Sequence, residues 1–469
     1  MERRSFLKQS SLAFIGAGLF NTAKAGSGTL INQRHAQGSA KNIIFLVSDG
    51  MSNGTLTMAN LLLQQKEGRN SHWVQLYHDN MVHRALMDTA SASSLVTDSA
   101  AASSSWGGGV RVKNGSLNVN EDGSFNIPIL QKFKAAGKSV GCVTSVPITH
   151  ATPAGFCINS GKRGNMEDIA SDYLKLKFDV MLGGGTEIFQ PEKRKDKRDL
   201  FGEFSKAGTA VVRSRNELLA IGKNNQKPVL GVFYPSALPY ALDREHDDDL
   251  KFQTPTLAEM AKIAIEQLSK NKNGFVMQIE GGKVDWAAHA NDAGALLYDQ
   301  IAFDDAVKVA IDFAKTDKET LVIVTTDHGN ANPGLFYGKE ADKNFERLFR
   351  FKHTNDWVLM GINRNFSTSQ VIERIEAAQG YAIKETEARE ILSHYEKLDE
   401  SGVYNSYKLP FKVLAEIQKK YTSIGWGSMD HSGDHVELAM YGPGSETLKP
   451  FVKNFELHNF MLQVAGVKV

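Results

Sequence analysis

The chain has 469 residues, of which 42% are hydrophobic and 23% charged, and its formal net charge is +1 at pH 7. This length is sufficient for a large buried core, and single-domain α/β enzymes often exceed the soft expectation of about 150 residues per domain. A nearly neutral chain without a long basic run argues against a nucleic-acid binding face. Beyond the amino-terminal region, no stretch is long and apolar enough for a transmembrane segment.

The first 25 residues have the three-part pattern of an export signal peptide. Arg3 and Arg4 give a charged start, SLAFIGAGLF is a short apolar region, and Ala23-Lys24-Ala25 is a small-residue cleavage site. We therefore expect a signal at 1–25 and an N-terminal segment at 26–40, with the protein exported to the periplasm or secreted. The paired arginines favour the twin-arginine route, whereas Glu2, where Ser or Thr is usual, favours general secretion, so both routes stay open.

Residues 42 to 330 alternate between strand-like and helix-like segments. Apolar runs predict strands at 42–48, 139–146, 178–182, 209–213, 228–234, 274–279 and 321–326, with one more at 436–442. Helical patterns lie at 127–139, 166–177, 257–270 and 295–315. Strands separated by helices of this length predict βαβ units, and hence an α/β fold with a mostly parallel central sheet and helices on both faces.

The sequence changes character between Asn330 and Ser428. This stretch is charged and has helical periodicity, and only DWVLMG (356–361) resembles a strand. We expect a largely helical insertion or cap at about 331–428, within one catalytic domain at 41–469; a continuation of the helical layer is the alternative. The acidic run at 247–249 is expected to be a solvated loop.

Ionisable side chains follow several of the predicted strands. NIIFLVSDG ends on Asp49, GFVMQIEGG carries Glu280, and LVIVTTDHG ends on Asp327 and His328. Ligands bind at the carboxyl ends of the strands of an open α/β sheet, so these groups are expected to converge. Hard carboxylates and imidazoles around a serine, Ser99 in TDSAA, indicate a two- or three-metal site with a nucleophile. A serine that merely caps a helix is the alternative for Ser99 alone.

Two further motifs supply metal ligands of lower local specificity. Asp285 and His289 are four residues apart in DWAAH, so they share one helix face and can bind one metal, although such a pair is often only a surface contact. In DHSGDH, His431 and His435 are both candidates, and the local sequence does not choose between them.

Taken together, these motifs resemble those of the alkaline phosphatase family over most of residues 41–445. VSDGMS resembles the first-strand motif, which implies that Asp49 bridges the second zinc and the magnesium. VTDSAA resembles the nucleophile motif, which implies that Ser99 is phosphorylated and metal-bound and that Asp98 assists it. HATPAGF implies Thr152 as a magnesium ligand, and Arg163 falls at the position of the phosphate-clamping arginine.

The remaining motifs complete the ligand set that the resemblance implies. IEGGKVDWAAH assigns Glu280 to magnesium and Asp285 and His289 to the first zinc. TTDHGN assigns Asp327 and His328 to the second zinc. DHSGDHVE assigns His431, rather than His435, to the first zinc.

The resemblance implies hydrolysis of small-molecule phosphate monoesters through a phosphoserine intermediate, with inorganic phosphate as a product. It implies two Zn²⁺ ions and one Mg²⁺ ion as cofactors. It also implies a homodimer, although the insertion leaves the oligomeric state open. His150 and Trp286 lie near the third metal, at positions that are Asp and Lys in one bacterial branch of the family. An imidazole there leaves Zn²⁺ as the alternative to Mg²⁺.

Two other functional classes are weaker interpretations of the same residues. The first class comprises other enzymes on the same core: a sulfatase, a phosphodiesterase or a phosphate-transferring mutase. A sulfatase would need a Cys/Ser-x-Pro-x-Arg run, which TDSAAAS lacks, and a phosphodiesterase would tolerate loss of the arginine clamp, whereas Arg163 is present. An exported phosphate- or metal-binding protein without catalysis would not need every catalytic position filled.

Only two cysteines are present, Cys142 and Cys157. One disulfide is an option in an oxidising compartment, but their apolar settings favour two buried thiols.

Overall fold

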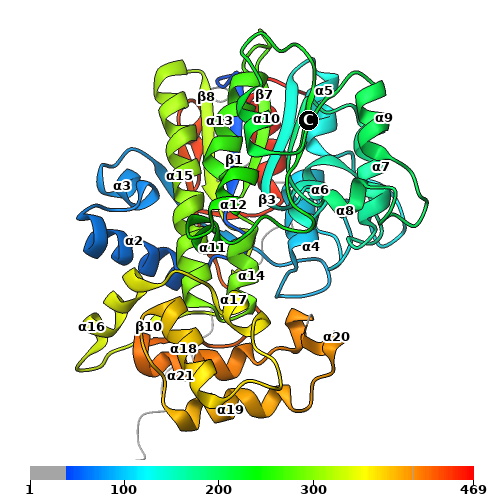
Figure 1. Cartoon of the computed structure of the whole chain (residues 1–469). Coiled ribbons are helices and arrows are strands. Elements are labelled where there is room, and N and C mark those ends of the chain that lie inside the picture. The colour runs from blue at the N-terminus through cyan, green and yellow to red at the C-terminus, as the bar shows by residue number, and fades with distance from the viewer. Residues whose placement is uncertain (1–37, 404, 469) are drawn as a thin grey trace, which may run out of the picture. The chain divides into compact units, whose positions relative to one another are not determined.

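The computed structural model describes residues 38–403 and 405–468 (Figure 1). The expected export signal lies outside the described residues, as does most of the segment 26–40. Among the helices in the described part of the chain, none combines the length and the apolar character that crossing a membrane requires.

A ten-stranded sheet in the order β14-β2-β13-β8-β1-β7-β3-β4-β6-β5 forms the centre of the fold. Its strands are β1 (Asn42–Val47), β2 (His83–Asp88), β3 (Ser139–Pro147), β4 (Val180–Gly184), β5 (Ala210–Val212), β6 (Val229–Val232), β7 (Phe275–Glu280), β8 (Thr320–Thr325), β13 (Val436–Tyr441) and β14 (Phe451–Lys453). Neighbouring strands pair in parallel except at β13, which is antiparallel to both β8 and β2. The predicted, mostly parallel sheet is therefore confirmed. The sequence pattern does not reveal β2 or β14, because β2 is largely exposed and β14 has only three residues.

The register at the centre of the sheet brings the ends of the strands to one level. Val47 of β1 pairs with Glu280 of β7 and with Thr325 of β8, and Thr144 of β3 pairs with Glu280. Because these four strands are parallel, the residues that follow them leave the sheet at the same edge.

Alternate residues of β1 contribute to two hydrophobic cores, as expected of a strand buried on both faces. Phe45 belongs to a core with α4 (Ser99–Gly108), α5 (Ile129–Ala135), α6 (Ala151–Cys157), α7 (Met166–Leu176), α8 (Thr186–Phe189), α9 (Leu200–Lys206) and α22 (Glu456–Val464). Leu46 belongs to a core with α3 (His72–His78), α10 (Arg215–Leu219), α13 (Leu257–Leu268), α14 (Lys283–His289) and α15 (Ala293–Asp317). Helices thus cover both faces of the sheet, and the short helices α11 (Ala241–Glu245), α12 (Asp248–Gln253) and η3 (Ser445–Thr447) lie in connections.

A third hydrophobic core lies mainly in the cap, which we define as residues 331–428. The cap contains α16 (Ala341–Phe345), η1 (Glu346–Arg350), α17 (Asn355–Met360), α18 (Thr368–Gln379), α19 (Glu385–Tyr395), α20 (Glu400–Val403), η2 (Ser406–Lys408) and α21 (Phe411–Thr422). Met58 and Leu62 of α2 (Asn53–Glu67) and Leu297 of α15 join this core, so the cap packs on helices that start near the carboxyl ends of the strands. Figure 1 shows it in yellow and orange below α14.

Two short ladders join the ends of the cap. β9 (Gly329–Asn330) pairs with β12 (His431–Ser432), and β10 (Gly334–Leu335) pairs with β11 (Ile424–Gly425), both antiparallel. The cap is therefore inserted between the partners of a two-stranded ladder.

Two local predictions are wrong. DWVLMG is not a strand but part of α17, whose N-cap Thr354 accepts a hydrogen bond from the Trp357 amide; a short apolar run does not distinguish a strand from one buried helical turn. The acidic run at 247–249 is exposed, as expected, but it starts α12, with Asp247 as the N-cap, because carboxylates are favourable at a helix N-terminus.

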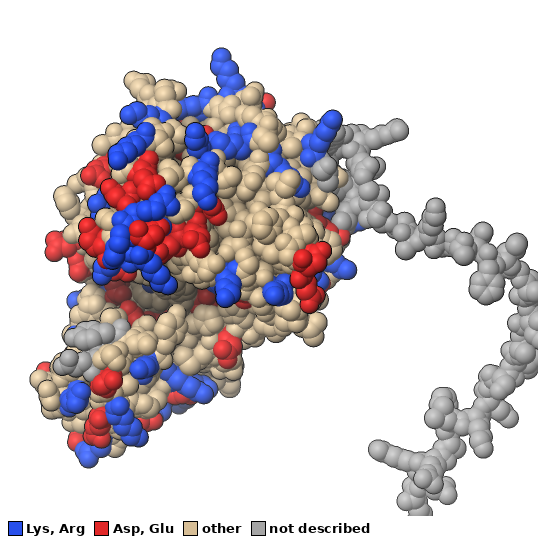
Figure 2. All heavy atoms as spheres, turned by 90° about the vertical axis from the view of Figure 1, so that its right-hand side faces the viewer, with Lys and Arg blue, Asp and Glu red and all other residues tan. Residues whose placement is uncertain are grey.

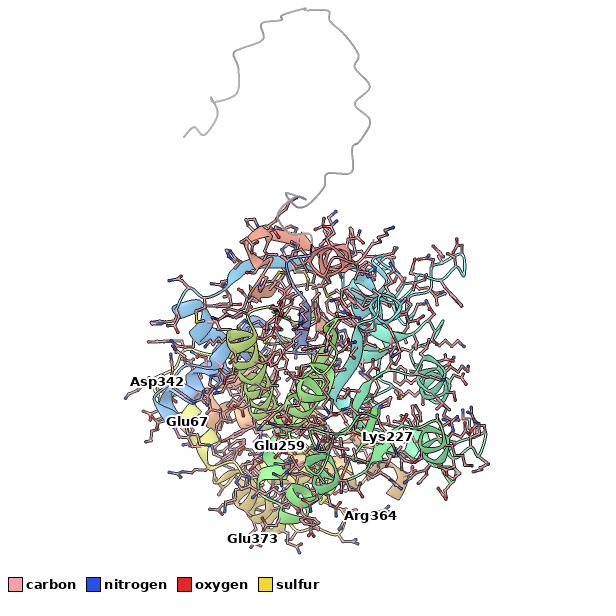
Figure 3. All side chains as sticks on the ribbon, turned by 90° about the horizontal axis from the view of Figure 1, so that it is seen from above. Glu67, Lys227, Glu259, Asp342, Arg364 and Glu373 are labelled. Carbon is pink, nitrogen blue, oxygen red and sulfur yellow. The ribbon has the colours of Figure 1, made fainter. Side chains whose placement is uncertain are left out.

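Charged side chains of both signs are interspersed on the face shown in Figure 2. Figure 3 shows the exposed Asp342, Arg364 and Glu373 of the cap at the periphery of the molecule.

Candidate metal and phosphate site

Three groups of potential metal ligands meet at the carboxyl edge of the central strands. We name them cluster 1 (Asp285, His289 and His431), cluster 2 (Asp49, Asp327 and His328) and cluster 3 (Asp49, His150 and Glu280); within each cluster the ligand atoms lie within 4.8 Å of one another. Asp49 belongs to two clusters, so clusters 2 and 3 adjoin.

Cluster 1 combines helix α14 with the ladder that closes the cap. Asp285 and His289 project from α14, and His431 arrives because β12 pairs with β9 directly opposite Asn330. The Nε2 atoms of His289 and His431 are 3.1 Å apart. The carboxylate of Asp285 lies 3.5 Å from His289 Nε2 and 3.6 Å from His431 Nε2.

Backbone carbonyls fix the tautomers of both histidines. His289 Nδ1 donates to the Met429 carbonyl at 2.7 Å, and His431 Nδ1 donates to the Thr97 carbonyl at 2.9 Å. With Nδ1 donating in both rings, the two Nε2 atoms that face each other are free to bind one cation between them. His435 is exposed and its ring packs against Phe451, so the structure brings His431 and not His435 into the cluster.

Cluster 2 surrounds the serine at the start of α4. His328 Nε2 is 3.3 Å from Ser99 Oγ, 3.2 Å from Asp327 Oδ2 and 3.6 Å from Asp49 Oδ1. Ser99 is the first residue of α4, and Asp98 is the N-cap, with Oδ1 accepting from the Ala101 amide. Free N–H groups at this helix start favour an anion beside the Ser99 hydroxyl.

A glycine permits the close approach of clusters 1 and 2. Gly50, with φ of +67°, donates its amide to Asp327 Oδ1 at 2.9 Å. A Cβ atom at this position would lie 2.4 Å from Asp285 Oδ1, so only glycine satisfies both the backbone conformation and the space.

Cluster 3 lies between β3, β7 and the start of α6. Thr144 Oγ1 donates to Glu280 Oε2 at 2.5 Å, and Thr152 Oγ1 donates to Asp49 Oδ2 at 3.4 Å. His150, the N-cap of α6, accepts at Nε2 from the Arg163 guanidinium at 3.2 Å. A neutral imidazole has one lone pair, so His150 can bind Arg163 or a cation but not both at once.

Arg163 and Trp286 flank this part of the site. Arg163 Nη1 donates to Asp98 Oδ2 at 2.9 Å, which places the guanidinium beside the residue that precedes Ser99. The Trp286 ring meets the His150 ring edge-on with centroids 6.0 Å apart, and the Lys283 ammonium lies 5.1 Å from the Trp286 ring.

The clusters gather buried carboxylates that lack hydrogen-bond donors. Asp49 Oδ1, Asp327 Oδ2 and Glu280 Oε1 are buried and accept no hydrogen bond. Burial and the neighbouring carboxylates raise the pKa of Asp49 well above its usual value, and burial raises the pKa of Glu280 to about 7. Buried carboxylate oxygens without donors are normally paired with cations, so this donor set fits bound metal ions.

The groups that hold the ligand side chains in place are not indicated by the sequence patterns. Asn330 Nδ2 donates to Asp285 Oδ1 at 2.7 Å, in addition to the roles of Thr144 and of the Thr97 and Met429 carbonyls. Asn330 lies in the motif TTDHGN and Thr97 in VTDSAA, so their place in these motifs is the only sign of their role in the sequence; Met429 has no such sign.

Comparisons with known proteins identify the family of this chain. The family model "Alkaline phosphatase" matches residues 40–467. Alkaline phosphatase 4 of Bacillus subtilis is 31% identical over 459 residues, covering 96% of this chain and 93% of the relative. Alkaline phosphatase 3 of the same organism is 32% identical over 431 residues, covering 90% and 88%. The crystal structure of Thermus thermophilus alkaline phosphatase superposes with a TM-score of 0.86 at 31% identity, covering 96% of both chains.

Proposed function

The chain belongs to the alkaline phosphatase family, whose members hydrolyse phosphate monoesters, and from this premise we propose that Ser99 is its nucleophile. The observation that carries the proposal is the Ser99 hydroxyl at a helix start, 3.3 Å from His328 Nε2 of cluster 2. Cluster 2 shares Asp49 with cluster 3, its His328 ring stacks on the His431 ring of cluster 1, and clusters 2 and 3 contain unsatisfied carboxylate oxygens. No other serine of the motif TDSAA competes, because Ser99 is the only one there.

We propose Zn²⁺ for clusters 1 and 2 and Mg²⁺ for cluster 3, with Zn²⁺ as the alternative there. Clusters 1 and 2 offer the imidazole and carboxylate ligands that suit zinc, and Ser99 Oγ completes cluster 2. Asp49, Glu280 and the Thr152 hydroxyl offer oxygen ligands that suit Mg²⁺, whereas the imidazole of His150 favours zinc. Bound cations would lower the pKa of the Ser99 hydroxyl and of a water molecule and would neutralise phosphoryl charge.

The reaction proceeds in two displacements at phosphorus. Ser99 Oγ forms a bond to phosphorus while the bond from phosphorus to the ester oxygen breaks, and the alcohol leaves with a proton. Water then attacks the phosphoserine, the Oγ–P bond breaks, and inorganic phosphate is released as the Ser99 hydroxyl is restored. Both steps depend on positioning and charge neutralisation, so the site selects the phosphate more than the alcohol.

Arg163 binds the phosphoryl group, and Asp98 positions Arg163. The planar guanidinium can donate two parallel hydrogen bonds to two phosphoryl oxygens, and Asp98 Oδ2 holds one edge of it from the residue next to Ser99. Asp98 therefore sets the position from which Arg163 meets the phosphate.

Acid trapping tests the nucleophile. The zinc- and magnesium-loaded protein is mixed with a phosphate-labelled aryl ester and quenched in acid, and peptide mapping is expected to locate the label on Ser99. Ser99→Ala should lose label and activity by orders of magnitude while keeping near-normal zinc, whereas Ser94→Ala, on the exposed loop before it, should keep both. Label on any other residue would refute the assignment.

We further propose that the protein is exported and assembles as a homodimer. Cell fractionation tests the first expectation, and light scattering of the purified protein tests the second.

A further inference from the structure

Two buried thiols, those of Cys142 and Cys157, lie next to each other. Cys142 lies in β3 and Cys157 ends α6, and their Sγ atoms are 3.5 Å apart. Both side chains are 0% exposed and both are free. The thiol of Cys142 also points at the Pro153 carbonyl in the first turn of α6, with its Sγ 4.0 Å from that oxygen.

The local geometry permits a covalent bond between them. A disulfide has an S–S distance of about 2.05 Å, so the sulfur atoms, 3.5 Å apart, need to approach by roughly 1.5 Å. The two residues are 15 apart, and the segment between them carries Thr144, His150 and Thr152.

We propose that Cys142 and Cys157 are a disulfide site that is oxidised only while the chain folds, before α6 packs on the sheet. The two thiols lose two protons and two electrons to a disulfide oxidant, such as oxidised glutathione, which is reduced to two thiols as the Cys142–Cys157 bond forms. Exchange proceeds through a mixed disulfide, and the oxidant therefore has to reach one sulfur.

In the folded protein the oxidant cannot reach either sulfur atom. Neither sulfur is exposed, and burial and the neighbouring Cys142 thiol raise the pKa of Cys157 well above its usual value, which leaves little of the reactive thiolate. Chains that fold reduced are thus expected to keep both thiols, and chains that fold in an oxidising medium are expected to carry the bond. This inference does not depend on the proposed catalytic roles.

Oxidative refolding tests the first half of the proposal. The reduced full-length protein is unfolded in guanidinium chloride and refolded with zinc and magnesium in a glutathione redox buffer. Non-reducing peptide mapping after alkylation should find most chains cross-linked between Cys142 and Cys157. Recovery of both cysteines as alkylated free thiols from correctly folded protein would overturn the proposal.

The folded, reduced holoenzyme is the matched control for access. In the same buffer and over the same time it should form no disulfide, and rapid oxidation without unfolding would contradict the shielding argument. Closing a loop of this length shifts the unfolding equilibrium by roughly a hundredfold, so oxidised wild type should unfold at a higher guanidinium concentration than reduced wild type. Cys157→Ser should unfold at the same concentration in both buffers; a redox-dependent shift in this variant would show another cause.

Discussion

Asp49 joins two metal clusters through one side chain. Its carboxylate lies in clusters 2 and 3, with Oδ1 facing His328 and Oδ2 accepting from Thr152. Under the proposed metal assignment one buried carboxylate faces two cations, so loss of either cation would leave its charge less compensated and strengthen binding of the other. The occupancies of clusters 2 and 3 are therefore expected to be coupled through Asp49.

Arg163 is expected to bind the phosphate rather than the metals. Arg163→Ala should raise the inhibition constant for inorganic phosphate by roughly ten- to a hundredfold, because a charged hydrogen bond contributes about 1.5–3 kcal/mol. Arg163→Lys should recover only part of the loss, since an ammonium lacks the planar fork. Inhibition assays measure the change, and metal analysis is the control: bound metal should stay equal or rise, because His150 Nε2 is released. Unchanged inhibition would place Arg163 outside the phosphate site.

At the residue scale, the sequence predicts the candidate metal ligands better than the groups that form hydrogen bonds with them. Carboxylates and a histidine directly after buried strands, such as Asp49 and His328, have no packing reason to be there, so the pattern is visible without a structure. Thr144 and Asn330 are ordinary polar residues, and their hydrogen bonds to Glu280 and Asp285 depend on three-dimensional proximity. Backbone carbonyls such as that of Met429 leave no trace in the residue types at all.

The turn after β1 sets the spacing between clusters 1 and 2. Gly50→Ala should lower the melting temperature and also weaken zinc binding at cluster 1, because the new methyl group would displace Asp285. Gly68→Ala is the matched control: its φ is +69°, similar to the +67° of Gly50, but nothing lies within 4 Å of the added Cβ. Both variants bear the cost of a left-handed alanine, about 1–2 kcal/mol. Equal zinc affinity in the two variants, measured by chelator competition, would contradict the argument.

The junction between α15 and the cap depends on the protonation of Asp292. This buried N-cap accepts from the Ala295 amide of α15 and from the Asn355 amide of α17, and burial raises its pKa to about 7. A carboxyl whose folded pKa is raised is favoured in its protonated form, so its contribution to stability is lost as the pH rises through about 7. We expect the metal-saturated protein to melt at lower temperature at pH 8 than at pH 6.

The variant Asp292→Asn distinguishes the contribution of Asp292 to this pH dependence from that of other buried carboxyl groups. It removes one titrating group, so the decrease in melting temperature between these two pH values should be smaller than in the wild type. Asp299 and Asp304, whose pKa values are also raised to about 7, preserve the rest of the decrease. An identical pH dependence in the variant would show that Asp292 does not titrate in this range.

At the element scale, long patterns are predicted well and short ones poorly. The helix α15 and the central strands follow their hydrophobic periodicity over many residues. The sequence of α17 predicts a strand, because six residues contain too few repeats to distinguish the helical period of 3.6 residues from the strand period of 2. The two-residue ladder of β9 and β12 has no periodicity, yet it delivers His431 to cluster 1.

The whole site is expected to depend on its cations for stability as well as activity. Chelation should abolish phosphomonoesterase activity and lower the melting temperature, because buried carboxylates such as Asp49 and Asp327 then repel one another. Zn²⁺ should restore activity, Mg²⁺ alone should not, and Mg²⁺ added after Zn²⁺ should raise activity further. Metal-free protein, verified by elemental analysis, that keeps its activity or its melting temperature would refute the metal assignment.

At the scale of the molecule, the sequence predicts the class of fold but not the order of its strands. Alternating strands and helices imply a parallel sheet with helices on both faces. Nothing local indicates that β1 lies between β7 and β8, or that the late strand β13 inserts in reverse between β2 and β8. That pairing is decided by packing between distant segments.

The insertion of the cap between β9 and β12 has a consequence for synthesis of the protein. Asp49, Ser99, Asp327 and His328 have all been made when the ribosome reaches the cap, but His431 has not. A chain released early therefore lacks a ligand of cluster 1, and a chain whose cap misfolds cannot bring β12 to β9. Chains that end before His431 are therefore expected to lack a complete cluster 1 and, with it, phosphomonoesterase activity.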